Sequence, residues 1–165
     1  MEILQTIRKG LDKILCAVCI FLFGLMVVVG TYQIVTRFIF NSPSTVSEEL
    51  LTYSFAWMAL LSAAYIFGKR DHMRMGFVAD KVTGTAKKVL EICIELLVVA
   101  FAAIAMVYGG INIMGLTMTQ TTASLPVTMG VIYTVLPLSG LFIVIYGILN
   151  IIDLAHGKGL DHEEN

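Results

Sequence analysis

Charged residues are scarce in this chain. Only 14% of its 165 residues are Asp, Glu, Lys or Arg, whereas 58% are hydrophobic and the mean hydropathy is +0.86. Soluble domains carry about a quarter charged residues, so this composition excludes an ordinary water-soluble domain. The formal net charge of −1 lacks the basic surplus of a general nucleic-acid-binding protein, and we expect no nucleic-acid partner.

Cysteine is also rare, and its placement excludes a disulfide framework. Cys16, Cys19 and Cys93 all fall within apolar stretches. Cys16 and Cys19 have C-x-x-C spacing, but their neighbours lack the polar or basic groups that favour a thiolate. We interpret the thiols as inert small hydrophobic side chains. The sequence also lacks a phosphate-binding loop, a metal-ligand cluster and catalytic-triad spacing, so we expect neither an enzyme nor a cofactor.

Long apolar stretches dominate what is present. A bilayer core needs about 20 residues of helix, and continuous apolar runs exclude the alternating pattern of a β-barrel. The uncharged segment between Glu95 and Asp153 is too long for one crossing and divides at residues 117–130, where turn-forming residues cluster. We therefore predict an all-α integral membrane protein with a single membrane domain (residues 1–155) and a polar cytoplasmic tail (residues 156–165). The four expected transmembrane helices are residues 14–36, 46–69, 86–117 and 130–153.

The placement of Lys and Arg predicts the orientation in the membrane. Ten of the eleven basic residues fall at the chain ends or between the second and third apolar stretches, and Arg37 is the exception. The ten are Arg8, Lys9, Lys13, Lys69, Arg70, Arg74, Lys81, Lys87, Lys88 and Lys158. Because cytoplasmic loops carry the excess of Lys and Arg, both termini are predicted to be cytoplasmic.

Two polar flanking segments have an amphipathic helical pattern. Residues 2–13 and residues 73–82 each place apolar side chains at helical spacing, with charged side chains elsewhere. We predict that each forms a short interfacial helix on the cytoplasmic membrane surface.

The segment before the second apolar stretch contains the partner-interface candidates Arg37, Glu48 and Glu49. Thr45 and Glu48 have the Thr-x-x-Glu spacing of a capping box, and acidic side chains in a first helical turn suit the helix dipole. Arg37 is a candidate ion-pair partner for either glutamate. Helix capping and the docking of a soluble or membrane partner both remain open for this segment.

Polar side chains within or beside the apolar stretches are further candidates. Trp57 lies in the middle of a stretch, and its N–H needs an acceptor, which favours a protein contact. Asn112 and Tyr133 raise the same question. Glu95 either reaches towards the membrane interface or contacts a basic group on a partner. His72 is interpreted as a loop residue near a helix end, with a pH switch as the alternative.

Three blocks of sequence form a pattern that covers nearly the whole chain. They are Arg37-Phe38-Ile39-Phe40 leading through Ser47-Glu48-Glu49-Leu50 to Trp57; Ala63-Ala64 followed by His72; and Ser124-Leu125-Pro126-Val127 with Tyr133 and Leu136-Pro137-Leu138. Together they resemble the small membrane subunit of tripartite ATP-independent periplasmic (TRAP) transporters, the DctQ- or SiaQ-like small permease component. The chain departs from the family pattern at Val46-Ser47, at Ser62 and at Met73-Arg74-Met75-Gly76.

The resemblance implies a small, non-catalytic scaffold subunit in the bacterial inner membrane. Such a subunit pairs with a large membrane subunit that carries the sodium and substrate sites. A periplasmic substrate-binding protein delivers an organic acid anion of the sialic acid or C4-dicarboxylate class, and the sodium gradient drives uptake without ATP. Pro126 and Pro137 then either shape the surface offered to the binding protein or end and kink helices.

Two other classes of protein are weighed against this expectation. A self-sufficient small transporter that forms an oligomer with a central pore is the alternative, but small multidrug exporters of this kind place a carboxylate in the first crossing. Residues 14–36 contain none. A membrane-embedded enzyme needs polar groups that converge at one depth, and the sequence offers no such set.

Overall fold

The computed structural model describes residues 2–69 and 85–155. Their helices are α1 (Glu2–Phe38), α2 (Thr45–Gly68), α4 (Thr85–Phe101), the π-helix η1 (Ala102–Tyr108), α5 (Gly109–Thr117), α6 (Met129–Tyr133) and α7 (Val135–Ala155). Four helical segments are long and apolar enough to cross a membrane: Gln5–Phe38, Thr45–Gly68, Val89–Thr117 and Met129–Leu154. The predicted all-α membrane protein with four transmembrane helices is confirmed. His72, the predicted interfacial segment 73–82 and the tail 156–165 lie outside the described residues.

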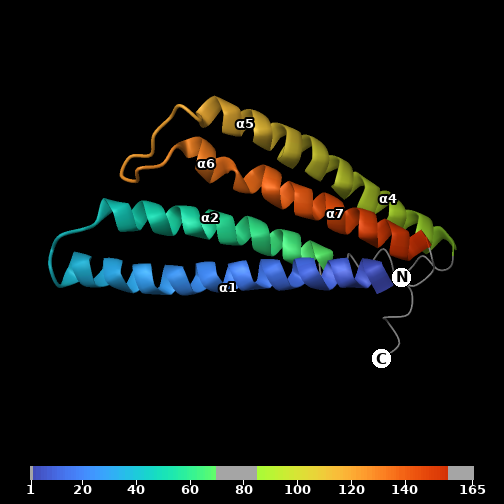
Figure 1. Cartoon of the computed structure of the whole chain (residues 1–165), viewed down its shortest axis with the longest axis horizontal. Helices are drawn as coiled ribbons and strands as arrows, with labels where there is room; N and C mark the ends of the chain where they lie inside the picture. The colour runs from blue at the N-terminus through green and yellow to red at the C-terminus, as the bar shows by residue number, and fades with distance from the viewer. Residues whose placement is uncertain (1, 70–84, 156–165) are drawn as a thin grey trace.

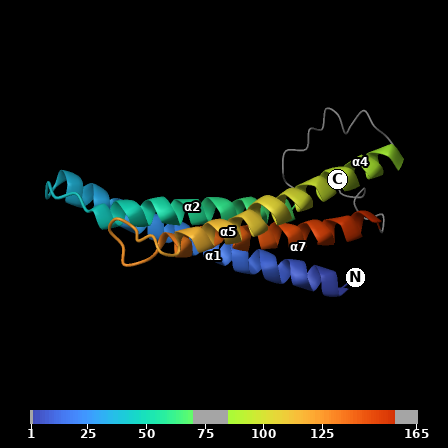
Figure 2. The same cartoon turned by 90° about the horizontal axis from the view of Figure 1, so that it is seen from above.

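The four spans form a single open layer (Figures 1 and 2). α1 packs along α2, α2 along α7, and α7 along a continuous rod made by α4, η1 and α5. α1 and this rod therefore lie at the two edges of the layer. The α1–α2 turn and residues 118–128 lie at one end of it, called here the loop end. The start of α1 and the end of α7 lie at the opposite end, called the terminal end (Figure 1).

The N-terminal amphipathic segment differs from its prediction. The sequence predicts a separate interfacial helix over residues 2–13, but this segment is the first part of α1, which runs without a break to Phe38. No proline interrupts it, and its polar side chains at Arg8 and Asp12 bond to α7. Leu15 follows on the same side and is fully buried in the core. Helix contacts within the chain therefore hold this segment.

An open layer buries little of each helix within the chain. The two inner spans are the most covered, because α2 lies between α1 and α7, and α7 lies between α2 and the rod. Apolar side chains at the edges are largely exposed: Phe21 of α1 by 69%, and Leu116 of α5 by 77%. Soluble monomers do not expose contiguous apolar surface on this scale. In a bilayer, acyl chains or another membrane protein cover these faces.

The turn between α1 and α2 corrects the predicted helix cap. The N-cap of α2 is Ser44, whose hydroxyl oxygen accepts a hydrogen bond from the Ser47 backbone N–H at 3.4 Å. The predicted capping box of Thr45 and Glu48 is therefore wrong: the cap lies one residue earlier, and the residue three positions after it is Ser47. Asn41 adopts a φ of 49° in this turn, a left-handed conformation that Asn tolerates better than most residues.

Gly68, the last residue of α2, allows α2 to approach α7 closely. A Cβ atom at this position would lie 2.6 Å from Cε1 of the Tyr146 ring. Tyr146 is fully buried, and its hydroxyl donates a hydrogen bond to Asp12 at 2.6 Å. A methyl group at position 68 would therefore overlap a ring that is fully buried and whose hydroxyl is bonded to α1.

We expect Gly68→Ala to lower the free energy of unfolding by about 1–3 kcal/mol, the usual cost of overpacking a filled core. Gly24 of α1 is the matched control, because a Cβ there meets nothing within 4 Å. Gly24→Ala is expected to leave stability unchanged or raise it by up to about 1 kcal/mol through helix propensity. Thermal unfolding of both variants in detergent, followed by the fluorescence of the single tryptophan, checks the contrast. Equal effects would contradict the assigned packing.

Candidate functional site

The loop end is organised around the carboxylate of Glu49. Glu49 lies in the first turns of α2, half-buried, and its two oxygens face residues 118–128. Oε1 accepts the backbone N–H of Ala123 at 3.0 Å, and Oε2 accepts those of Ser124 at 2.8 Å and Leu125 at 3.1 Å. Tyr53, one turn along α2, donates its hydroxyl to Oε1 at 3.2 Å. Hydrogen bonds to an ionised acceptor are stronger than neutral ones, so this carboxylate anchors the loop.

The anchored loop also has its own internal order. Thr122, which is buried, donates its hydroxyl to the Leu125 carbonyl at 2.7 Å and accepts the Leu125 N–H at 3.1 Å. The Thr122 N–H donates to the Val127 carbonyl at 3.2 Å, and the Met129 N–H to the Gln120 carbonyl at 2.8 Å. These bonds close the segment into a compact hairpin-like turn. Its backbone amides at residues 123–125 are thereby presented together to Glu49.

Trp57 supplies a second contact between α2 and the chain that follows the loop. Its indole N–H donates to the backbone carbonyl of Ile132, in α6, at 3.0 Å. The protein contact expected for this tryptophan is thus found within the chain itself. Glu49 and Trp57 therefore join α2 to residues 123–125 of the loop and to α6, which follows the loop.

The remaining loop-end candidates do not converge on one site. Arg37 and Glu48 are exposed, and within the described residues no ion pair joins Arg37 to either glutamate. Pro126 is exposed on the loop, and Tyr133 is partly exposed at the end of α6. Pro137 lies within α7, half-buried, where its ring sits against Gly110 of α5.

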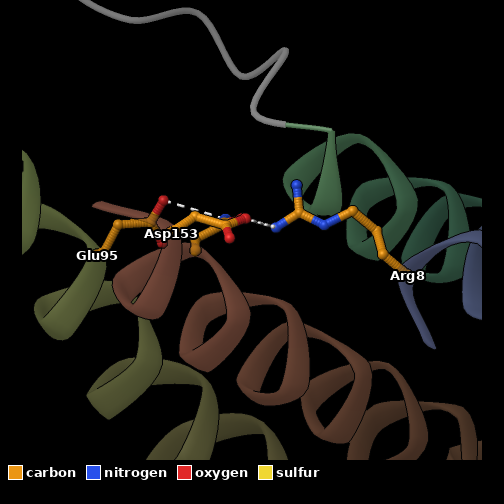
Figure 3. Close-up of polar contacts among 4 residues, drawn as sticks. Arg8, Glu95 and Asp153 are labelled. Atoms are coloured by element: carbon orange, nitrogen blue, oxygen red, sulfur yellow. Dashed lines mark hydrogen bonds and ion pairs between the residues drawn. The ribbon is translucent and has the colours of Figure 1, made fainter. Parts of the chain in front are cut away.

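A second polar constellation lies at the terminal end and joins three helices (Figure 3). Nη2 of Arg8 in α1 donates to Oδ1 of Asn150 at 2.8 Å and forms an ion pair with Oδ2 of Asp153 at 3.1 Å, both in α7. Nδ2 of Asn150 donates to Oε1 of Glu95 in α4 at 3.1 Å. Asn150 is fully buried between the two charged groups. Its amide therefore bridges the guanidinium and the carboxylate.

A neighbouring hydrogen bond adds to the same constellation. The hydroxyl of Tyr146, one turn before Asn150 on α7, donates to Oδ1 of Asp12 on α1 at 2.6 Å. Arg8 and Asp12 are themselves one turn apart, so two successive turns of α1 bond to two successive turns of α7. α1 is thereby fixed against α7 at the terminal end.

Sequence reasoning anticipated part of these sites and missed the rest. Glu95 was a candidate, but its observed contact is to Asn150 of its own chain. Arg8, Asp12, Tyr146 and Asn150 were not identified. The one available signal was the i, i+4 spacing of polar residues on each of two helices, Arg8 and Asp12 on α1, and Tyr146 and Asn150 on α7.

These features define a multi-pass helical membrane protein. It has four apolar spans, hydrogen-bonded polar clusters at both ends of the layer, and exposed apolar edges. Within residues 2–69 and 85–155, no group of three or more His, Cys, Asp or Glu side chains is arranged to hold a metal ion. Residues 26–157 match the family described as "Tripartite ATP-independent periplasmic transporters, DctQ component". The chain belongs to this family of transporter membrane subunits, which are not enzymes.

Two relatives carry names that agree with this family. The chain is 29% identical over 146 residues to the "Sialic acid TRAP transporter small permease protein SiaQ" of Vibrio cholerae serotype O1, covering 86% of this chain and 81% of the relative. It is 24% identical over 94 residues to a "Putative TRAP transporter small permease protein" of Haemophilus influenzae, covering 57% of this chain and 58% of the relative. The chain is therefore a TRAP-type small permease component.

Proposed function

We propose that the chain is the small scaffold subunit of a sodium-coupled TRAP transporter that imports an organic acid anion across the bacterial inner membrane. In this role it pairs with a large membrane subunit, which carries the sodium and substrate sites, and works with a periplasmic substrate-binding protein. The anion is of the sialic acid or C4-dicarboxylate class. The Vibrio cholerae relative is named for sialic acid, and this name supports the carboxylate class of the cargo.

The observation that carries the proposal is the distribution of polar groups in the layer. Asp, Glu, Lys, Arg and His are absent from residues 14–36, from residues 50–68 and from the sequence between Glu95 and Asp153. The polar constellations around Glu49 and Asn150 lie at opposite ends of the layer. A chain whose charged side chains lie near the ends of its spans is a poor ion pathway. A layer whose helices are held together by hydrogen bonds at both ends is instead suited to support a moving partner subunit.

The proposed orientation places the loop end outside the cytoplasm. The Lys and Arg distribution supports this assignment, since ten of eleven basic residues lie at the chain ends or between the second and third spans. Residues 118–128, with Pro126 exposed, then face the periplasm, where the binding protein arrives. Arg37, Glu48 and Tyr133 lie at or near this end and remain candidates for contact with either partner. His72 remains a candidate on the cytoplasmic side.

Reconstitution tests the proposed role. The chain, the large membrane subunit and the loaded binding protein are combined in liposomes with an inward sodium gradient, and uptake of labelled sialic acid or C4-dicarboxylate is measured. We expect uptake with all three components and none when this chain or the large subunit is omitted. Saturable uptake by this chain alone would overturn the proposal in favour of a self-sufficient oligomeric transporter.

Reporter tags at Ser42 and Thr121 test the proposed orientation and are expected on the periplasmic side.

A further inference from the structure

The outer face of the α4–η1–α5 rod carries two polar side chains in an otherwise apolar surface. Tyr108, the last residue of η1, is 68% exposed, and Asn112 of α5, four residues later, is also exposed. Both belong to the apolar span Val89–Thr117. Among the residues that the structure describes, neither the phenol nor the carboxamide has a hydrogen-bond partner. The two groups share one side of the rod because residues four apart lie on the same helix face.

The depth of these groups makes their exposure informative. α5 ends at Thr117, and a helix rises about 1.5 Å per residue, so Asn112 lies about 7.5 Å and Tyr108 about 13 Å inside the span. Acyl chains offer no hydrogen-bonding groups at that depth, and polar groups left unsatisfied in hydrocarbon are costly. The face is therefore better matched by a protein surface than by lipid.

Gly115 adds a steric feature to the same face. It lies three residues after Asn112, it is exposed, and a Cβ atom built on it meets nothing within 4 Å. The neighbouring glycines Gly110 and Gly130 differ, because each is already used in a close contact within the chain. Small residues allow a second transmembrane helix to approach the backbone closely, and polar side chains beside them join helices in lipid.

The opposite edge of the layer offers a contrast within the same molecule. Along residues 14–30 of α1, every exposed residue is apolar or glycine. The exposed positions are Ile14, Ala17, Ile20, Phe21, Phe23, Gly24, Val27 and Val28. This stretch is fully compatible with acyl chains. Nearer the loop end, α1 also exposes Thr31 and Tyr32, the latter by 55%, so the contrast with the rod applies to residues 14–30 of α1.

We propose that Tyr108, Asn112 and Gly115 form a docking ridge for a transmembrane helix of the large membrane subunit. The inference rests on the proposed function, which supplies a membrane-embedded partner. The partner helix presents hydrogen-bonding groups opposite the phenol and the carboxamide and crosses close to Gly115. Residues 14–30 of α1, by contrast, face lipid.

Photocrosslinking in the assembled complex locates the ridge directly. A photoreactive amino acid is placed at Leu116, beside Gly115 and 77% exposed, or at Phe21 on α1, 69% exposed. The variants are co-expressed with the large subunit in membranes and irradiated. We expect an adduct with the large subunit from position 116 and none from position 21. An adduct of position 116 with a second copy of this chain, or a large-subunit adduct from position 21 alone, would overturn the assignment.

Substitutions test the ridge by affinity. We expect Gly115→Leu to reduce recovery of the large subunit on the tagged chain about tenfold, and Asn112→Leu about threefold. Gly24→Leu is the matched control, because Gly24 is exposed and equally open, and its recovery is expected to be unchanged. Size-exclusion profiles and melting temperatures of the isolated variants check folding, and crosslinking at position 116 remains informative if a variant fails to fold.

The outcomes separate the two proposals. If the unsubstituted chain does not retain the large subunit, the proposed function fails, and the ridge fails with it. If the unsubstituted chain retains the large subunit and Gly115→Leu retains it equally well, only the ridge is overturned. Selective loss with Gly115→Leu and Asn112→Leu supports both.

Discussion

Glu49→Gln is expected to release residues 118–128 from α2. A single carboxylate accepts three consecutive backbone N–H groups and a phenol, at distances from 2.8 to 3.2 Å. A carboxamide has only one acceptor oxygen, and its NH₂ group would face backbone donors. We expect the amides of Ala123, Ser124 and Leu125 to exchange hydrogen about tenfold faster, since local opening sets their protection. Hydrogen exchange with peptide-resolved mass spectrometry measures this change.

Glu48 is the matched control for this prediction. It precedes Glu49 in the same turn of α2, but its side chain is exposed and makes no hydrogen bond within the described residues. Glu48→Gln removes the same charge from the same helix end and is expected to leave exchange at residues 123–125 unchanged. An equal acceleration in both variants would show that the helix-end charge, and not the anchoring contact, orders the loop.

Asn150→Leu is expected to lower the free energy of unfolding by about 2 kcal/mol, because buried polar partners lose their hydrogen bonds. Asn150 is fully buried and bridges Arg8 to Glu95, so its removal leaves both charged groups without this bond. The chain provides a matched control in Asn112, which is exposed. Asn112→Leu in the isolated chain is expected to leave the melting temperature nearly unchanged.

A double-mutant cycle with Arg8→Met assigns part of that loss to the bridge itself. If Arg8 and Asn150 act through their 2.8 Å hydrogen bond, the double variant is expected to lose less stability than the two single losses combined, by about 0.5–3 kcal/mol. Thermal unfolding in detergent, followed by Trp57 fluorescence, provides all four values. Strict additivity would contradict direct coupling between α1 and α7 at this point.

The polar constellations around Glu49 and around Asn150 compensate for the limited apolar core of an open layer. A closed bundle surrounds a shared apolar centre, whereas this layer has α2 and α6–α7 between neighbouring helices and leaves α1 and the α4–η1–α5 rod at open edges. Glu49 and Trp57 join α2 to the loop and α6 at one end, and Arg8, Asn150 and Glu95 join α1, α7 and α4 at the other. Charge-assisted and buried hydrogen bonds of this kind fix orientation more than they add bulk stability.

The sequence by itself determined the membrane class, the number of spans and the family. These features depend on local composition, because a run of about 20 uncharged apolar residues becomes a helix in lipid wherever its neighbours lie. The family pattern around Glu48, Glu49 and Trp57 is likewise a property of residues close in sequence. The boundaries of interfacial segments were less accessible, since nothing local distinguishes a separate amphipathic helix over residues 2–13 from the start of a longer one.

Only the tertiary structure decided which polar residues meet. Glu49 reaches amides 74–76 positions away, and Arg8 reaches Asn150 and Asp153 at separations of 142 and 145. Such pairs depend on helix order and rotation, which a pattern of apolar residues does not specify because lipid accepts any apolar face. The order α1, α2, α7 and then the α4–η1–α5 rod sets these contacts. The same order places Tyr108, Asn112 and Gly115 at an open edge.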